Sequence, residues 1–334
     1  MDIVTQALIG VALSRAFFRR AVPNATLLLI FAATIPDIDY LSHLRGALTA
    51  LELQRGYTHS LVALPFLAVI CVALTALICR QHTQIAKSWL IACFGVAVHL
   101  LLDFTGNYGI RALLPFSSRW FYLDWNASYD GVILTALALA IVSPWFVNLV
   151  SGEIGDRTKK PGQGSAIVVL LFILMYDGAR WSLHERALNQ LNSRLYDGEN
   201  ALSVAAFAQP INPLSWTGIV ETQDAFRVVK TGSLDIGDVT DSQIFFKPPI
   251  TPEYRRAMQL EPFRYMAYFA RFPVWQIEPA TLDSGTGKQL ELTDLRLGTL
   301  GDTVIRATTV MDQTGRVISA DFGKLTISSV NRLR

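Results

Sequence analysis

The sequence predicts a mainly α-helical membrane bundle in the N-terminal half of the chain and a small, β-rich soluble domain in the C-terminal half. The 334 residues are 51% hydrophobic, more than in most soluble proteins, and the long apolar runs lie almost entirely before residue 183. After about residue 212, short runs of Val, Ile, Thr and aromatic residues alternate with turns that contain Gly or Asp, which is the pattern of strands. We therefore expect a membrane domain over residues 1–183, a helical linker over 184–211 and the β-rich domain over 212–334.

Four apolar stretches are candidates for membrane-spanning helices, because a helix needs roughly 20 apolar residues to cross a bilayer. They are Leu61–Cys79, Ser88–Leu102, Gly131–Val150 and the run that begins with Ala166–Tyr176. Two earlier runs, Ala7–Phe18 and Thr26–Ile35, are each too short to cross alone, and we expect them to pair as an embedded hairpin. The membrane domain should therefore hold four spanning helices preceded by that hairpin.

Six runs in the last third of the chain have the residue pattern of strands. They are Trp216–Glu221, Phe226–Lys230, Val274–Glu278, Gln289–Leu295, Val304–Met311 and Val317–Phe322. Turn residues separate them, as at 283–287 and 312–315, and a helix near Arg180–Leu195 is expected to connect this domain to the membrane.

Net charge and cysteine content exclude several classes of protein. A net charge of +2, without a basic stripe, gives no support for nucleic-acid binding. The three cysteines all lie in apolar runs, so the sequence has no disulfide framework and no C-x-x-C metal motif. Eight Lys and Arg residues fall in the loops on one side of the expected bundle and four on the other. The positive-inside rule then places the acidic and histidine motifs, with the C-terminal domain, on the periplasmic side of an inner membrane.

Ionisable residues gather at the ends of the apolar runs. His99 and Asp103 are four residues apart, so a helix presents both on one face, and such groups are costly inside a membrane unless they have partners. Asp37, Asp39 and His59 lie at the ends of neighbouring runs. Mixed His and Asp sets bind divalent cations, so these five residues are predicted to hold one or two ions, with zinc favoured and manganese or magnesium as alternatives. The simpler explanations are a His–Asp pair that joins two helices, an Asp that caps a helix and a His at the membrane interface.

Five further residues are candidates for catalysis or substrate binding. Asn107 and Tyr108 lie between two glycines that permit a tight turn near the predicted site. Arg119 could bind a phosphate or a lipid headgroup. Asp130 or Asp2 could accept a proton as a general base, although an acid at the position of Asp130 also serves simply to stabilise the start of a helix.

Several short motifs occur in the order and spacing of a known family. They are Met1-Asp2-x-x-Thr5, Pro36-Asp37-Ile38-Asp39, Arg55-Gly56-x-Thr58-His59-Ser60, His99-x-x-x-Asp103 and Asn107-Tyr108-Gly109 with Pro115-Phe116-Ser117. Over about residues 1–150 the chain resembles the predicted membrane-bound metal-dependent hydrolases (YdjM-like), and its C-terminal part looks like the extension of longer members. The resemblance implies a metal-dependent hydrolytic site in a multipass membrane protein. The family usually has a histidine where this chain has Gln6, which implies fewer bound ions, use of Asp2 instead, or lost activity.

Three interpretations of function follow from these residues. The first is a membrane-bound, divalent-metal-dependent hydrolase of an ester or phosphoester, with membrane lipids as partners and a lipid-like substrate. The second is a non-catalytic envelope protein with a structural metal site and a partner-binding β-domain, which Gln6 favours. The third is a transporter that uses His99 and Asp103 inside the membrane, although carriers usually have related halves and this sequence has none.

Overall fold

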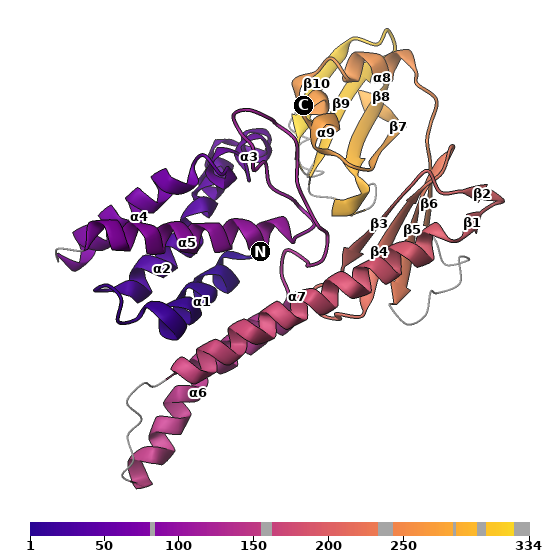
Figure 1. Cartoon of the computed structure of the whole chain (residues 1–334). Helices are drawn as coiled ribbons and strands as arrows, with labels where there is room; N and C mark the ends of the chain where they lie inside the picture. The colour runs from indigo at the N-terminus through magenta and orange to yellow at the C-terminus, as the bar shows by residue number, and fades with distance from the viewer. Residues whose placement is uncertain (81–83, 155–161, 233–242, 283–284, 299–304, 324–334) are drawn as a thin grey trace.

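Apolar helices form the N-terminal half of the protein and antiparallel sheets form its C-terminal region (Figure 1). The computed structural model describes residues 1–80, 84–154, 162–232, 243–282, 285–298 and 305–323. The predicted fold class is therefore confirmed.

Ten helical segments of the N-terminal half, with the 3-10 and π-helical ones denoted η, make up the described membrane domain. They are α1 (Ile3–Leu13), η1 (Ser14–Phe18), α2 (Ala25–Thr34), η2 (Ile35–Arg45), α3 (Ala47–Leu53), η3 (Tyr57–His59), α4 (Leu64–Cys79), α5 (Ile85–Phe104), α6 (Gly131–Ile154) and α7 (Gln163–Asn192). The expected hairpin is present, because α1 with η1 packs against α2 across a turn in which Asn24 has a φ of 56°. A left-handed conformation of this kind suits asparagine better than most residues.

Three helical segments are long and apolar enough to cross a membrane, and a fourth is added if one bent pair counts as a single span. The three are Ala25–Arg45, Ile85–Phe104 and Gln163–Asn192, and the bent pair joins Ala47–His59 to Leu64–Cys79 at 88°. The expectation that the second arm of the hairpin is too short to cross alone is wrong, because η2 continues from α2 and extends it. Within the described residues, the helix expected from Leu61 begins only at Leu64, where Pro65 occupies a first-turn position that needs no amide hydrogen.

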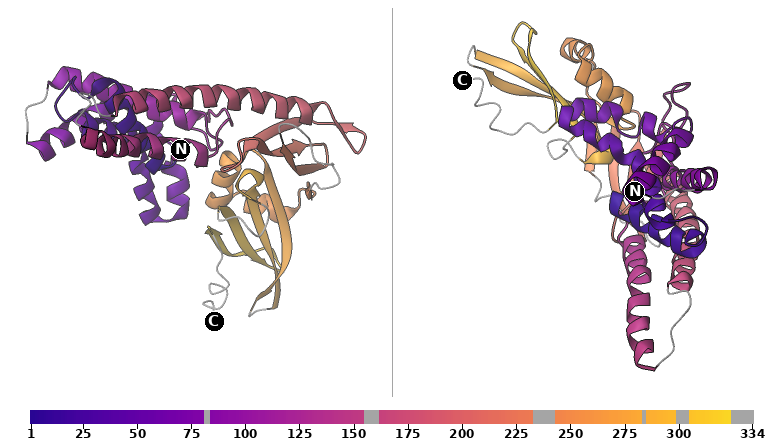
Figure 2. Two further views of the ribbon diagram at one scale, coloured as in Figure 1. Left: turned by 90° about the horizontal axis from the view of Figure 1, so that it is seen from below. Right: turned by 90° about the vertical axis from the view of Figure 1, so that its left-hand side faces the viewer.

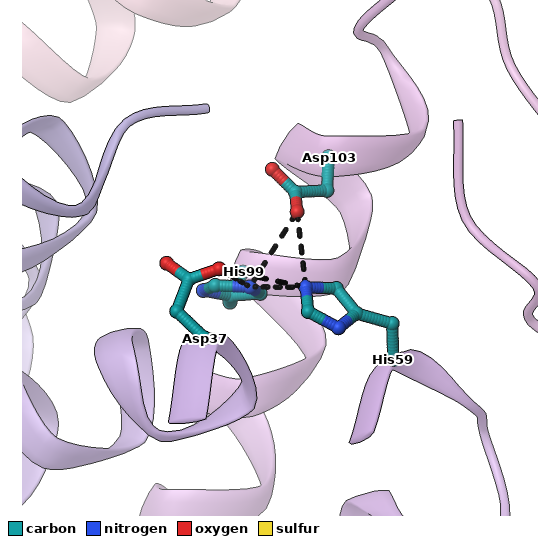
Figure 3. Close-up of side chains that lie close together, drawn as sticks. All are labelled: Asp37, His59, His99 and Asp103. Carbon is teal, nitrogen blue, oxygen red and sulfur yellow. Dashed lines mark hydrogen bonds and ion pairs between the residues drawn. The ribbon is translucent and has the colours of Figure 1, made fainter. Parts of the chain in front are cut away.

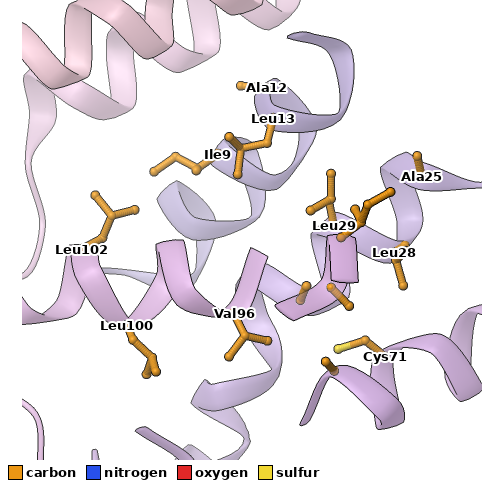
Figure 4. Close-up of a cluster of buried hydrophobic side chains, with 14 of the residues drawn as sticks. Ile9, Ala12, Leu13, Ala25, Leu28, Leu29, Cys71, Val96, Leu100 and Leu102 are labelled. Carbon is orange, nitrogen blue, oxygen red and sulfur yellow. The ribbon is translucent and has the colours of Figure 1, made fainter. Parts of the chain in front are cut away.

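Close contact between α2 and α5 fixes the part of the bundle that carries the ionisable residues. Leu29 of α2 and Val96 of α5 belong to one buried apolar cluster (Figure 4). A Cβ atom added at Gly95 would lie 2.7 Å from the Cβ of Ala32, so the two helices approach each other here only because residue 95 has no side chain. This approach brings His99, one turn further along α5, beside the end of α2.

Two four-stranded antiparallel sheets build the C-terminal region. Their strand orders are β3-β4-β5-β6 and β10-β9-β8-β7, and β1 (Leu195–Tyr196) and β2 (Glu199–Asn200) form a separate hairpin. The strands of the sheets are β3 (Ser203–Ala208), β4 (Ser215–Glu221), β5 (Ala225–Gly232), β6 (Gln243–Phe246), β7 (Pro273–Leu282), β8 (Gly285–Asp294), β9 (Arg306–Asp312) and β10 (Val317–Phe322). All six predicted strands are confirmed over the residues that the structure describes.

Three features of the C-terminal half differ from the sequence prediction. The linker expected to be helical over 184–211 is helical only to Asn192, and its remainder includes β1, β2 and β3. β3 forms because it pairs along its whole length with β4, which buries its apolar residues. Strand β6 and the short helices α8 (Pro252–Ala257) and α9 (Glu261–Phe269) were not predicted, and α9 packs against the second sheet.

The sheets lie at the far end of α7, which runs from the helical bundle to the β3–β6 sheet (Figures 1 and 2). Leu191 near the end of α7 packs against Gly218 of β4, where a Cβ atom would lie 2.8 Å from the leucine side chain. A second connection joins the loop after α5 to the chain between α9 and β7, where Arg271 forms a two-contact ion pair with Asp124 at 2.8 and 2.9 Å. The C-terminal region is therefore attached directly to the loop that follows His99 and Asp103.

Candidate metal centre

Four buried side chains from three segments converge at the end of α5 (Figure 3). Asp37 comes from the first turn of η2, His59 ends η3, and His99 and Asp103 occupy successive turns of α5. Each of the four residues is at most 4% exposed. The predicted convergence of these residues is present in the structure.

The spacing of the four donor atoms fits a single small cation. His59 Nε2 lies 3.2 Å from both His99 Nε2 and Asp103 Oδ2, and Asp37 Oδ1 lies 3.6 Å from His59 Nε2. All four donor atoms lie within 4.8 Å of one another. Ligands in a tetrahedral zinc site stand about 2.0–2.1 Å from the ion and therefore about 3.3 Å from one another. The set needs little rearrangement to hold zinc.

Both imidazoles are oriented by contacts on the side of the ring that faces away from the centre. His99 Nδ1 lies 2.6 Å from the backbone oxygen of Ala33, so its Nδ1–H donates to that carbonyl. His59 Nδ1 lies 3.3 Å from Asp39 Oδ2 and 3.0 Å from the hydroxyl of Thr58. Such outer contacts fix the tautomer of metal-binding histidines and leave Nε2 with its lone pair toward the ion. Asp39, predicted as a ligand, is thus placed behind His59 and outside the group of four.

Buried carboxylate oxygens without hydrogen-bond partners indicate that the centre suits a cation. Both side-chain oxygens of Asp37 and Oδ2 of Asp103 are buried and accept no hydrogen bond from any described residue. Burying an ionised carboxylate whose oxygens accept no hydrogen bond, as those of Asp37 do not, is strongly unfavourable, whereas a divalent cation bound between two carboxylates and two imidazoles removes that cost. The donor set is therefore chemically suited to zinc, and the carboxylates also accommodate manganese or magnesium.

The other oxygen of Asp103, Oδ1, is held by three donors, of which the sequence analysis singled out only Gln6. The terminal amino group of Met1 bonds to it, Nη2 of Arg55 lies 3.3 Å away and Nε2 of Gln6 lies 3.4 Å away. Arg55 is 4% exposed and has a φ of 50°. A buried arginine beside apolar helices is itself a signal of function, and this could have identified Arg55.

Gln6 faces the centre, so its exchange for histidine is informative. Oε1 of Gln6 is buried and has no hydrogen-bond partner, which leaves a polar position that an imidazole could fill. Gln6→His should tighten zinc binding by about tenfold, the lower end of what neighbouring groups contribute to metal affinity. Competition with a chelator in detergent measures this, with Gln259→His in the turn between α8 and α9, where Gln259 is exposed, as the control. Equal zinc affinity in Gln6→His and the parent protein would contradict a role for position 6.

The two predicted general bases both cap helices. Asp2 accepts hydrogen bonds from the amides of Val4 and Thr5 at 3.1 and 2.9 Å, and from the Thr5 hydroxyl. Asp130 accepts from the first amides of α6 at 2.9 and 3.1 Å and from the hydroxyl of Tyr176 at 3.0 Å. Each carboxylate would have to release these donors before it accepted a proton from a reactant.

The predicted substrate-binding residues occupy the loop after α5. Tyr108 donates to Gln54 at 3.2 Å and lies under the guanidinium of Arg55, 5.0 Å from ring centre to Cζ. Burial raises the pKa of the Tyr108 phenol, so the hydroxyl stays a donor at neutral pH. Asn107 accepts from Ser128 and from Arg296, and Arg119 is exposed beside Phe121. Among the described contacts of these three predicted residues, only Tyr108 is connected to the candidate metal centre. The connection runs through Arg55, which lies over the Tyr108 ring and bonds to Asp103.

Comparison with known proteins identifies the family of this chain. The uncharacterized protein YfhP of Bacillus subtilis (strain 168) is 30% identical over 157 residues, a match that covers 44% of this chain and 46% of YfhP. The chain therefore matches less than half the length of this relative. No solved structure matches the chain. The family model of the YdjM inner membrane protein matches residues 1–187, which include all four residues of the centre and most of α7. Because this match extends over more than half of the chain, the protein belongs to the YdjM inner membrane protein family.

Proposed function

We propose that this protein is a membrane-bound, divalent-metal-dependent hydrolase that acts on an ester or phosphoester of a lipid-like substrate. The observation that carries the proposal is the convergence of two imidazoles and two carboxylates from separate segments, with carboxylate oxygens that lack hydrogen-bond partners. A bound divalent cation supplies a Lewis acid for the substrate oxygen and lowers the pKa of water. The four side chains would hold this cation, and the contacts to Asp39 and Ala33 would keep both imidazoles in place.

Arg55 would act as the second cationic group of the site. Its guanidinium is buried and lies on the Oδ1 side of Asp103, away from the donor atom Oδ2. Arginine donors form strong, charge-assisted hydrogen bonds to phosphoryl and carboxyl oxygens. A substrate oxygen next to Asp103 would therefore meet a positive charge that the fold has already positioned and desolvated.

The position of the centre supports a lipid-like substrate. Asp103 lies at the end of the candidate span Ile85–Phe104, and His59 lies at the break of the bent pair that forms the fourth candidate span. Large apolar side chains such as Leu174 and Met175 of α7 are more than 70% exposed, as expected for contact with acyl chains. The excess of Lys and Arg in the loops expected on the other side of the bundle supports an orientation with the centre toward the periplasm.

A structural metal site is the second candidate function, and one observation favours it. The four residues of the centre are at most 4% exposed, and a hydrolytic site needs a coordination position open to water, whereas structural sites are closed by protein. The hydrolase proposal therefore requires that substrate or water reach the centre through a local opening.

Hydrolysis by the metal-loaded, full-length protein in phospholipid vesicles separates the two candidates. We expect release of product from a lipid ester or phosphoester, and a loss of at least about 100-fold in His59→Ala, because changes in the surroundings of a metal alone cost about 10- to 100-fold. His43→Ala, an exposed histidine of η2, should keep full activity. A protein that binds stoichiometric metal but hydrolyses none of a broad lipid panel supports the structural site instead.

A further inference from the structure

An apolar groove lies on the surface between η2, α3 and η3. Its volume is about 440 Å³, within the range of about 300–1,000 Å³ typical of small-molecule sites. The apolar side chains that line it come from Ile38, Leu41, Leu44, Leu53 and Tyr57, and they are between 40% and 86% exposed. Five large apolar side chains are thus gathered around one hollow without covering one another.

The groove adjoins the metal centre without opening into it. Asp39 and Thr58 belong to its lining, and the same two residues contact Nδ1 of His59. The Nε2 atom of His59 faces the other three donors. The groove and the candidate metal centre therefore lie on opposite sides of one imidazole ring and are separate sites.

A cationic residue stands at the edge of the groove. Arg45 is the last residue of η2, is exposed and forms part of the groove lining. No carboxylate lies within ion-pair distance of it among the described residues. Arg45 also ends the candidate span that begins at Ala25, and arginines at the ends of spans lie at the level of the lipid headgroups.

We propose that this groove binds one anionic phospholipid, with an acyl chain along Leu41, Leu44 and Leu53 and the phosphate group at Arg45. The apolar lining comes mainly from η2, the end of a candidate span, so its surroundings in the cell are acyl chains and headgroups rather than water. An unpaired arginine beside an apolar hollow matches a ligand with a hydrocarbon chain and an adjacent negative charge. The groove should therefore select lipids by their headgroup, whereas the ordinary lipid-facing surface of a helix does not.

Photocrosslinking to lipids of known composition tests this proposal. The full-length protein, with a photoreactive benzoylphenylalanine in place of Leu44, is placed in vesicles of phosphatidylethanolamine and phosphatidylglycerol, and its lipid adducts are identified by mass spectrometry. We expect several-fold more phosphatidylglycerol among the adducts than in the vesicles. The same photoreactive residue in place of Leu174, exposed on α7 away from the groove, should give adducts in the vesicle ratio.

Variants of Arg45 test whether its positive charge causes the enrichment of phosphatidylglycerol. Arg45→Gln should abolish the enrichment at position 44, and Arg45→Lys should keep most of it, which also shows that the groove itself is intact. Equal adduct composition at positions 44 and 174 would overturn the proposal. Adducts to residues 324–334 of the same chain would also overturn it, because Gly323 lies beside Ala47 of α3 and that segment would then be the occupant. None of these measurements involves metal or hydrolysis, so their failure leaves the proposed enzymatic function untouched.

Discussion

His99→Ala should reduce the zinc affinity of the protein by about 100- to 1,000-fold. Four-ligand zinc sites bind with about 10–16 kcal/mol, so one ligand of four contributes about 2.5–4 kcal/mol, and each 1.4 kcal/mol is a factor of ten. His99 is a sensitive position because its Nε2 lies 3.2 Å from His59 Nε2 and its Nδ1 is already bonded to the oxygen of Ala33. Metal per protein, measured by elemental mass spectrometry after purification in detergent, gives the result directly.

A matched control is available on the same protein. His43 lies on η2, the segment that carries Asp37, but it is exposed, and its ring bonds to the backbone oxygen of Tyr40 and stacks on the Tyr40 ring. His43→Ala should therefore keep the metal content of the parent protein. If His99→Ala also kept it, while remaining folded, the four side chains would not share one ion.

The candidate centre could be predicted from sequence where one helix or one short motif determines it. His99 and Asp103 are a helical turn apart on α5, so their common face follows from the 3.6-residue period. Asp37 and Asp39 show the limit of this reasoning. Because η2 is a 3-10 helix with about three residues per turn, residues two apart point about 240° apart, and the two carboxylates reach opposite sides of His59.

Other parts of the centre depend on packing that no local pattern encodes. Gln6 and Arg55 reach Asp103 from positions 97 and 48 residues away in the chain. Their approach requires α1 to pack on the bundle and the backbone of Arg55 to adopt a positive φ. Asp130 could be interpreted equally as a base or as a helix cap from its sequence position, and only its hydrogen bonds to the first amides of α6 identify the cap.

The fold was predictable to a similar extent. Strands β4, β5 and β7–β10 follow from alternating apolar residues and turn residues. Helices α8 and α9 have six and nine residues, too short for a clear helical period. The length of the second arm of the expected hairpin was underestimated because its apolar run ends at Ile35, whereas the helical chain continues as η2, with Pro36 in the first turn.

The ion pair between Arg271 and Asp124 should hold the C-terminal region against the loop that follows the metal centre. The Asp124 side chain is 7% exposed and that of Arg271 is 19% exposed. The guanidinium also lies 3.5 Å from the ring centre of Tyr122 and 5.4 Å from that of Phe207. Arg271 therefore connects that loop to strand β3 of the first sheet, and its own amide donates to Asp294 at the end of β8.

Arg271→Ala should lower the free energy of unfolding of the C-terminal region by about 3 kcal/mol. Removing one partner of a buried ion pair costs about 3–5 kcal/mol, and the partial exposure of Arg271 favours the lower value. Burial already raises the pKa of the Asp124 carboxyl, and Arg271 opposes that rise. Without Arg271 the folded pKa should rise further above the unfolded value.

The loss of unfolding free energy in Arg271→Ala should therefore depend on pH. A folded pKa above the unfolded one means that the folded protein binds the proton more tightly. The deficit relative to the parent protein should consequently be largest above the folded pKa of Asp124 in the variant, and should shrink as the pH falls from there towards the lower folded pKa of Asp124 in the parent protein. Urea unfolding in detergent, followed by near-ultraviolet circular dichroism at several pH values, measures this.

Two further variants test whether the lost ion pair causes the loss of stability in Arg271→Ala. Asp124→Asn combined with Arg271→Ala should be less destabilised than the sum of the single variants, and should lose the pH dependence, because no buried carboxylate remains. Arg264→Ala on the exposed side of α9 should leave stability within about 0.5 kcal/mol of the parent value. If Arg271→Ala matched this control at every pH, the ion pair would not attach the C-terminal region, and other contacts would do so, among them the hydrogen bonds from Arg296 to Asn107 and from Tyr265 to Glu52.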